Sequence, residues 1–241
     1  MAALIAVCSG YLIAPLGMAA VNVAIPAMAD DLGADANKIG WLPTLYLLSN
    51  VAFMLPVGKI ADNYGRKKMY MAGLLLNALS AFMCAIATHI DWVLFWRFVQ
   101  GASAAMIFGT GIAIVTSVVP STRRGSALGI VASCVYIGLT LAPAVGGYLT
   151  QYIDWRAVFY FQVPIVIVLV IFIHFTLKGE WVSPDKTGFD YTGAVLFGTF
   201  STCFVIGLSM LPDVLGIVLS LLSLLSLLTF IWHQSQSASP L

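Results

Sequence analysis

The chain has 241 residues, of which 61% are apolar and 9% are charged, and its net charge is +1. Soluble domains are about 45–50% apolar and about 25% charged, so this composition excludes a soluble enzyme. The near-neutral charge excludes a generally basic nucleic-acid-binding protein. The apolar stretches are longer than the ~10 residues of a membrane β-strand, and the sequence therefore predicts an all-α integral membrane protein.

Eight stretches have the length of about 20 residues that a helix needs to cross a bilayer. We predict spans at residues 4–27, 39–57, 69–88, 92–118, 126–150, 157–177, 191–210 and 214–232. The loops after the second, fourth and sixth spans contain eight of the lysines and arginines, whereas the loops on the other side contain Lys38 and Arg156. Because basic loops stay in the cytoplasm, we expect a multi-pass protein of the plasma or inner membrane with both termini cytoplasmic.

The loop between the second and third spans combines turn-forming and charged residues. Gly58 and Gly65 suit its two ends, and Asp62 can cap a helix or pair with Arg66 and Lys67. The loop resembles, position by position, the signature loop of the major facilitator superfamily, G-x-[LI]-A-D-x-x-G-R-[RK]. The resemblance implies that these five residues form a cytoplasmic gate.

The fourth span contains Arg97, the only charged residue that we place well inside a span. An arginine there costs at least ~2.5–3.5 kcal/mol, so it is a candidate functional residue. The alternative is that its side chain extends to the outer interface near Trp92. Arg97, Gln100 and Gly101 resemble the R-x-x-Q-G motif of the same superfamily.

The fifth span contains a run of small residues around a proline. Gly138, Ala142, Pro143, Gly146 and Gly147 resemble the G-x-x-x-G-P-x-x-G-G motif of the superfamily's antiporters, with alanine at one glycine position. Small residues let helices approach closely, and a proline bends a helix. We expect this helix to seal the transport pathway, the alternative being a simple packing groove.

Three further segments resemble the fourteen-helix drug:proton antiporters of the superfamily. They are V-N-V-A-I-P at residues 21–26, W-R-x-x-F-x-x-Q-V-P at 155–164, where the family usually has asparagine at Gln162, and F-D-x-x-G at 189–193. The resemblance implies an N-terminal six-helix bundle of two inverted three-helix repeats at 1–177 and a cytoplasmic loop at 178–190. An extra transmembrane hairpin at 191–232 and a cytoplasmic tail at 233–241 would follow.

The resemblance implies efflux of small amphipathic compounds of the multidrug type by proton antiport with alternating access. The proton gradient would supply the energy, without a cofactor, and the expected partners are the lipid bilayer and a small-molecule substrate. We expect this chain to be one half of the transporter, completed by a missing C-terminal half or a second copy. The polar residues that we assign to the substrate and proton pathway are Asn22, Tyr46, Asn50, Arg97, Gln100 and Tyr136.

One position departs from the family pattern. Many of these antiporters have an acidic residue where this chain has Gly17, and no Asp or Glu lies deep in any predicted span. A non-transporting membrane subunit and a metabolite uniporter or symporter therefore remain alternatives. The cysteines and histidines are isolated and no phosphate-binding loop occurs, so we predict neither a metal site nor enzymatic activity.

Overall fold

The structure, a computed structural model, describes residues 2–177, 179–182 and 188–237. These residues are all-helical, without a strand, and eight stretches are long and apolar enough to cross a membrane. The helices are α1 (Ala2–Leu32), α2 (Ala36–Tyr64), α3 (Arg66–Ala85), α4 (Ile90–Val118), η1 (Ser121–Arg123), α5 (Arg124–Tyr152), α6 (Ala157–Tyr160), α7 (Gln162–Thr176), α8 (Tyr191–Ser209) and α9 (Val214–Gln236). Helices α6 and α7 together form the sixth span.

Most helices are longer than the predicted spans, because their polar ends continue beyond the apolar stretch. Helix α1 includes Asp30 and Asp31, and α2 begins where the Asp35 carboxylate accepts a hydrogen bond of 2.7 Å from the backbone N–H of Lys38. Helix α9 continues to Gln236, into the predicted tail. Parts of the predicted loop 178–190, including Lys178 and Lys186, and the end of the tail lie outside the described residues.

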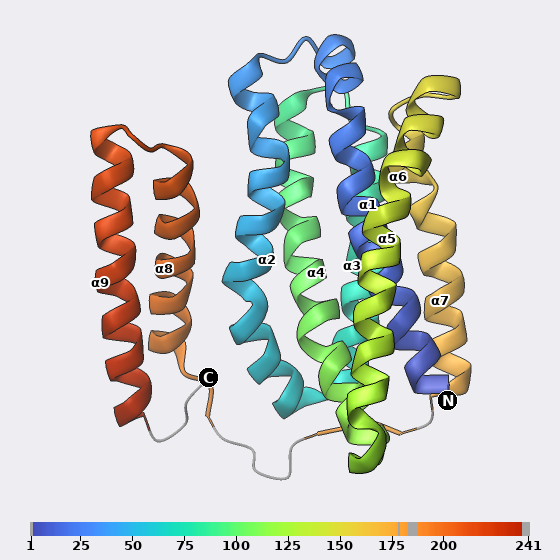
Figure 1. Ribbon diagram of the computed structural model, residues 1–241, viewed down its shortest axis with the longest axis vertical. Helices are drawn as coiled ribbons and strands as arrows, with labels where there is room; N and C mark the ends of the chain where they lie inside the picture. Colours follow the sequence, from blue (N-terminus) through green and yellow to red (C-terminus); the bar gives the residue numbers. More distant parts are fainter. Residues whose placement is uncertain (1, 178, 183–187, 238–241) are drawn as a thin grey trace.

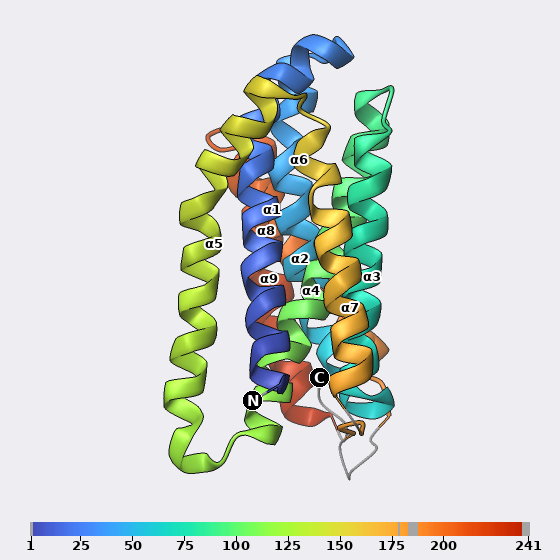
Figure 2. The ribbon, with the colours of Figure 1, turned by 90° about the vertical axis from the view of Figure 1, so that its right-hand side faces the viewer.

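The six spans of α1 to α7 form one bundle, and the α8–α9 hairpin lies beside it, next to α2 (Figure 1). Within the bundle α1 packs along α5, and α2 packs along α4 (Figure 2). If the first three spans are exchanged with the second three, the α1–α5 pair becomes the α4–α2 pair. This is the pairing that two three-helix repeats produce.

The bundle has two apolar cores, one near each end. One contains Tyr11, Tyr70 and Ile107, and the other contains Met28 and Phe159, all of them almost fully buried. On α4 these cores include residues 107–115 and 90–93, so the residues in between separate them. That intervening stretch contains the buried polar side chains from which the candidate site is built.

The hairpin is closed by hydrogen bonds between the start of α8 and the end of α9. Asp190 accepts hydrogen bonds from the Gly193 backbone N–H and the Gln234 amide, each at 2.8 Å, and its Oδ1 lies 2.9 Å from Nε2 of His233. Burial alone would raise the pKa of Asp190, but the hydrogen bonds from Gly193, His233 and Gln234 outweigh it and hold the pKa below its usual value.

Candidate functional site

The candidate site is a layer of polar side chains between the two apolar cores, and Arg97 is its only charge. Arg97 is fully buried, so its side chain does not extend to the interface, and that alternative is wrong. Its Nη1 donates a hydrogen bond of 2.7 Å to Oε1 of Gln100. Its guanidinium carbon lies 4.6 Å from the centre of the Tyr46 ring, within range of a cation–π interaction. The α4 arginine is therefore held by one residue of its own helix and one of α2.

The layer continues toward α3 through a chain of hydrogen bonds. The Ser103 hydroxyl donates to the carbonyl of Gln100 at 2.6 Å, and the Asn77 amide donates to the Ser103 hydroxyl at 3.2 Å. Neither Asn77 nor Ser103 was predicted as a site residue. The signal was present in the sequence, because Gln100 and Ser103 are three residues apart in an apolar span and therefore share a helix face.

Buried polar atoms without a hydrogen-bond partner are concentrated near this layer. Among the described residues there are seven such side-chain atoms, and six of them belong to residues 46–50 of α2 and 96–97 of α4. They are Tyr46 Oη, Ser49 Oγ, Asn50 Nδ2, Trp96 Nε1, and Arg97 Nε and Nη2. Such groups are costly to bury, and unpaired ones mark places where water or a ligand binds.

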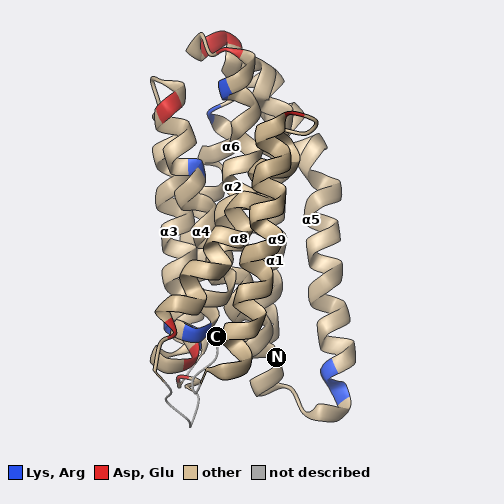
Figure 3. Ribbon diagram, turned by 90° about the vertical axis from the view of Figure 1, so that its left-hand side faces the viewer, with Lys and Arg blue, Asp and Glu red and all other residues tan. Residues whose placement is uncertain are grey.

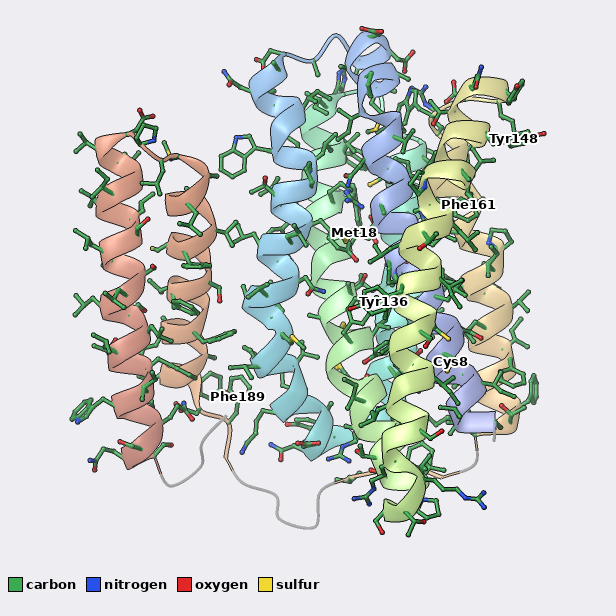
Figure 4. All side chains as sticks on the ribbon, in the orientation of Figure 1. Cys8, Met18, Tyr136, Tyr148, Phe161 and Phe189 are labelled. Atoms are coloured by element: carbon green, nitrogen blue, oxygen red, sulfur yellow. The ribbon has the colours of Figure 1, made fainter. Side chains whose placement is uncertain are left out.

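The structure divides the six predicted pathway residues into two groups. Tyr46, Arg97 and Gln100 come together inside the bundle, with Asn50 one turn further along α2 and half-buried. Asn22 of α1 and Tyr136 of α5 are exposed on the outside of the bundle, and Tyr136 is labelled in Figure 4. These two residues are therefore not part of the buried Arg97 layer.

Four of the predicted gate residues, Asp62, Gly65, Arg66 and Lys67, lie together at the end of the bundle where α2 and α3 meet. Gly58 lies inside α2, which continues to Tyr64, so it does not end the helix as predicted. Nε of Arg66 lies 2.7 Å from the Asp62 carboxylate, and Nη1 of Arg66 donates to the Ser117 hydroxyl at 2.7 Å. Gly65 has a φ of 123°, a conformation that side chains rarely adopt. The bond from Arg66 to Ser117 joins this loop to the last turn of α4. Most other charged residues also lie at the two ends of the helices (Figure 3).

A segment after α7 also binds this loop, which the sequence did not reveal. Oε1 of Glu180 accepts a hydrogen bond of 2.7 Å from the Lys67 backbone N–H, and the Arg66 N–H donates to the Trp181 carbonyl at 3.0 Å. The Lys67 ammonium donates to the carbonyl of Leu177. Glu180 therefore satisfies a free N–H group in the first turn of α3, where a negative charge is favourable.

The small residues of α5 face α1. A Cβ added at Gly146 would lie 2.6 Å from the carbonyl oxygen of Ala20, and one at Gly138 would collide with the carbonyl of Leu12. Ala142, between them, is fully buried, whereas Pro143 is exposed. Gly147 has only Val23 near it, at 4.0 Å. The predicted close helix approach is therefore made by two of the three motif glycines.

The position of Gly17 on α1 is covered by Gln162 of α7. A Cβ built on Gly17 would collide with the carboxamide of Gln162, whose Nε2 donates a hydrogen bond of 2.8 Å to the carbonyl of Val158. Gln162 is itself almost fully buried. The space beside position 17, where the resemblance to the antiporters led us to expect an acidic side chain, is therefore filled by an amide from another helix.

Comparisons with known proteins agree with this architecture. Similar proteins include the riboflavin transporter RibZ of Clostridioides difficile, 28% identical over 86% of this chain and 45% of that protein. The multidrug resistance protein Stp of Mycobacterium tuberculosis is 28% identical over 92% of this chain and 42% of its own length. The putative multidrug resistance protein MdtD of Yersinia enterocolitica is 29% identical over 96% and 50%. The chain thus spans about half the length of these relatives.

A solved structure shows the same fold. The crystal structure of the human organic anion transporter MFSD10 superposes with a TM-score of 0.67, covering 84% of this chain and 55% of that one at 15% identity. The family model of the Major Facilitator Superfamily matches residues 7–236. The predicted all-α membrane fold and the predicted superfamily are confirmed: this chain belongs to the major facilitator superfamily.

Proposed function

We propose that the chain forms one half of a membrane transporter that exports small amphipathic compounds in exchange for protons. Two relatives, Stp and MdtD, are named as multidrug resistance proteins, which supports export of this substrate class. The observation that supports antiport most directly is the contact of Gly138 and Gly146 with the α1 backbone, because these glycines belong to the segment that resembles the antiporter motif. A second half, on the same polypeptide or in a second copy, would complete the pathway.

In this proposal each part of the structure has a mechanical role. The two halves rock around a site at the middle of the membrane, which opens to one side at a time. The Asp62–Arg66 pair, joined to Ser117 of α4, belongs to the gate on the cytoplasmic side, the side that also holds both termini. The α1–α5 contact keeps these two helices together and limits leakage between them.

The packing at Gly146 offers a direct test with a matched control. A side chain at this position collides with the Ala20 carbonyl, whereas one at the adjacent Gly147 finds room. We expect Gly146→Ala to reduce substrate-dependent proton movement in inside-out membrane vesicles severalfold, and Gly147→Ala to retain it. Equal activity of the two variants at equal expression would contradict the proposal.

A second candidate function is transport of a metabolite without proton antiport. The packing of Gly17 against Gln162 favours this second candidate, because α1 then has no carboxylate at position 17. The relative RibZ is named as a riboflavin transporter, which adds a metabolite to the candidate substrate classes. Transport that persists after a proton uncoupler is added would support this candidate, and loss of transport would support antiport. A protein that moves no substrate at all would support a non-transporting subunit.

A further inference from the structure

The guanidinium of Arg97 has one edge without a partner. Nη1 is bound to Gln100, while Nε and Nη2 have no hydrogen-bond partner. Nε–H and the adjacent N–H of Nη2 point in the same direction, with a spacing that matches the two oxygens of a carboxylate. The free edge is therefore shaped for a bidentate anionic group, and a single water molecule could satisfy only part of it.

The charge of Arg97 is also unbalanced. Within the described residues, the carboxylates that form ion pairs do so elsewhere: Asp62 with Arg66, Asp31 and Asp154 with Arg156, Asp91 with Lys38, and Asp190 with His233. Arg97 is fully buried between apolar cores, where an uncompensated charge is costly, and the Tyr46 ring offsets only part of that cost. The layer needs a negative charge that these residues do not supply.

We propose that the Nε–Nη2 edge of Arg97 binds the carboxylate of a small organic acid, which is carried by the protein as substrate. Tyr46 and Ser49 of α2 contact α4 at Gly101, one turn from Arg97. Their hydroxyls are buried and have no hydrogen-bond partner, so they can supply further donors to the carboxylate. The inference rests on the proposed transport only for the origin of the ligand. It narrows the substrate class from amphipathic compounds in general to those that carry a carboxylate.

The site is closed in this conformation. A Cβ on Gly101 would collide with the carbonyl of Tyr46, so the backbones of α2 and α4 are in contact one turn from Arg97. Tyr46 covers one face of the guanidinium and is itself 2% exposed. A carboxylate therefore reaches the Nε–Nη2 edge when α2 moves away from α4.

Binding can be measured without transport. The protein, isolated at its natural length from its own membranes, is heated with benzoate, acetate or chloride at constant ionic strength, and the unfolding midpoint is followed with anion concentration. A ligand that binds the folded state raises this midpoint. We expect both carboxylates to raise it more than chloride does. Arg97→Lys, which keeps the charge but loses the paired donors, should raise the half-saturating concentration about tenfold.

Controls separate this site from other effects of anions. Arg156→Gln, at a partly buried arginine that pairs with Asp31 at the C-terminal end of α1, should respond as the wild type does. If Arg97→Lys is unstable, Tyr46→Phe removes one hydroxyl donor and should weaken carboxylate binding severalfold. Chloride acting as strongly as benzoate, or carboxylate binding that is unchanged in both variants, would overturn the inference. Export of amphipathic cations by a protein that binds no carboxylate would overturn it too and leave the proposed transport intact.

Discussion

The carboxamide of Gln162 occupies the space into which any side chain at position 17 would extend, so α1 and α7 fit together only because residue 17 is glycine. Substitution of Gly17 by alanine forces this amide to move and strains its hydrogen bond to the Val158 carbonyl. We expect Gly17→Ala to lower the free energy of unfolding by about 1–3 kcal/mol, as overpacked cores do.

A double-substitution cycle tests whether Gln162 is the cause. In Gln162→Ala the space beside Gly17 is empty, so Gly17→Ala should then cost little, and the coupling between the two sites should be measurable. Unfolding of all four proteins in the same detergent gives the cycle. Purely additive losses would show that α1 is perturbed for another reason.

The Asp62–Arg66 pair gives a prediction about transport rather than stability. Both side chains are partly exposed, and such pairs contribute about 0–1 kcal/mol, so Asp62→Asn should insert and fold normally. We expect it to reduce transport severalfold, because Arg66 then loses its charged partner and has only neutral acceptors, among them Ser117 and the Ala113 carbonyl. Transport rates at equal membrane abundance measure this, and an unchanged rate would remove Asp62 from the gate.

Glu180 provides a prediction about local order at the start of α3. In Glu180→Ala the backbone N–H of Lys67 loses its acceptor, at a cost of about 0.5–2 kcal/mol typical of a lost helix cap. Amide hydrogen exchange at Lys67 should accelerate accordingly. Glu180→Gln keeps a carbonyl oxygen in the same place and should retain most of the protection. Identical exchange in the two variants would argue against the contact.

The hairpin gives a prediction about pH. Because the pKa of Asp190 is lowered in the folded protein, its contribution to stability is present above the usual aspartate pKa of about 3.9. The contribution is lost as the pH falls below that value, toward the folded pKa. We expect the protection of the Gly193 amide, measured against its intrinsic exchange rate at each pH, to fall over this acid range, and Asp190→Ala, which removes the acceptor, to show low protection at every pH. A wild type whose exchange follows the variant at neutral pH would contradict the assignment.

The helices of this protein could be predicted from sequence because membrane spans are long apolar runs with a strong signal. The α5 motif could also be interpreted, since small residues four apart predict close packing, and Gly138 and Gly146 indeed contact α1. Helix ends were predicted less well. Hydropathy decreases where polar residues such as Asp30 begin, although the backbone of α1 stays helical through Leu32.

The side-chain partners could not be predicted. Glu180 lies more than a hundred residues from Lys67 in the chain, and no spacing rule connects two residues whose meeting depends on how α3 and α7 pack. The burial of Arg97 could not be predicted from the sequence for the same reason. Its distance from Trp92 allowed its side chain to extend to the interface, and only the packing of α2 against α4 determines that the guanidinium lies under Tyr46 instead.

The contact between α1 and α5 has a consequence for motion. Where two backbones touch at Gly138 and again at Gly146, sliding one helix along the other by a single residue brings a side chain into the place of a glycine. The α1–α5 contact therefore resists sliding along the helix axes, although the two helices can still tilt together. In any conformational change of this protein α1 and α5 should move as one rigid body, and the hinges should lie elsewhere in the bundle.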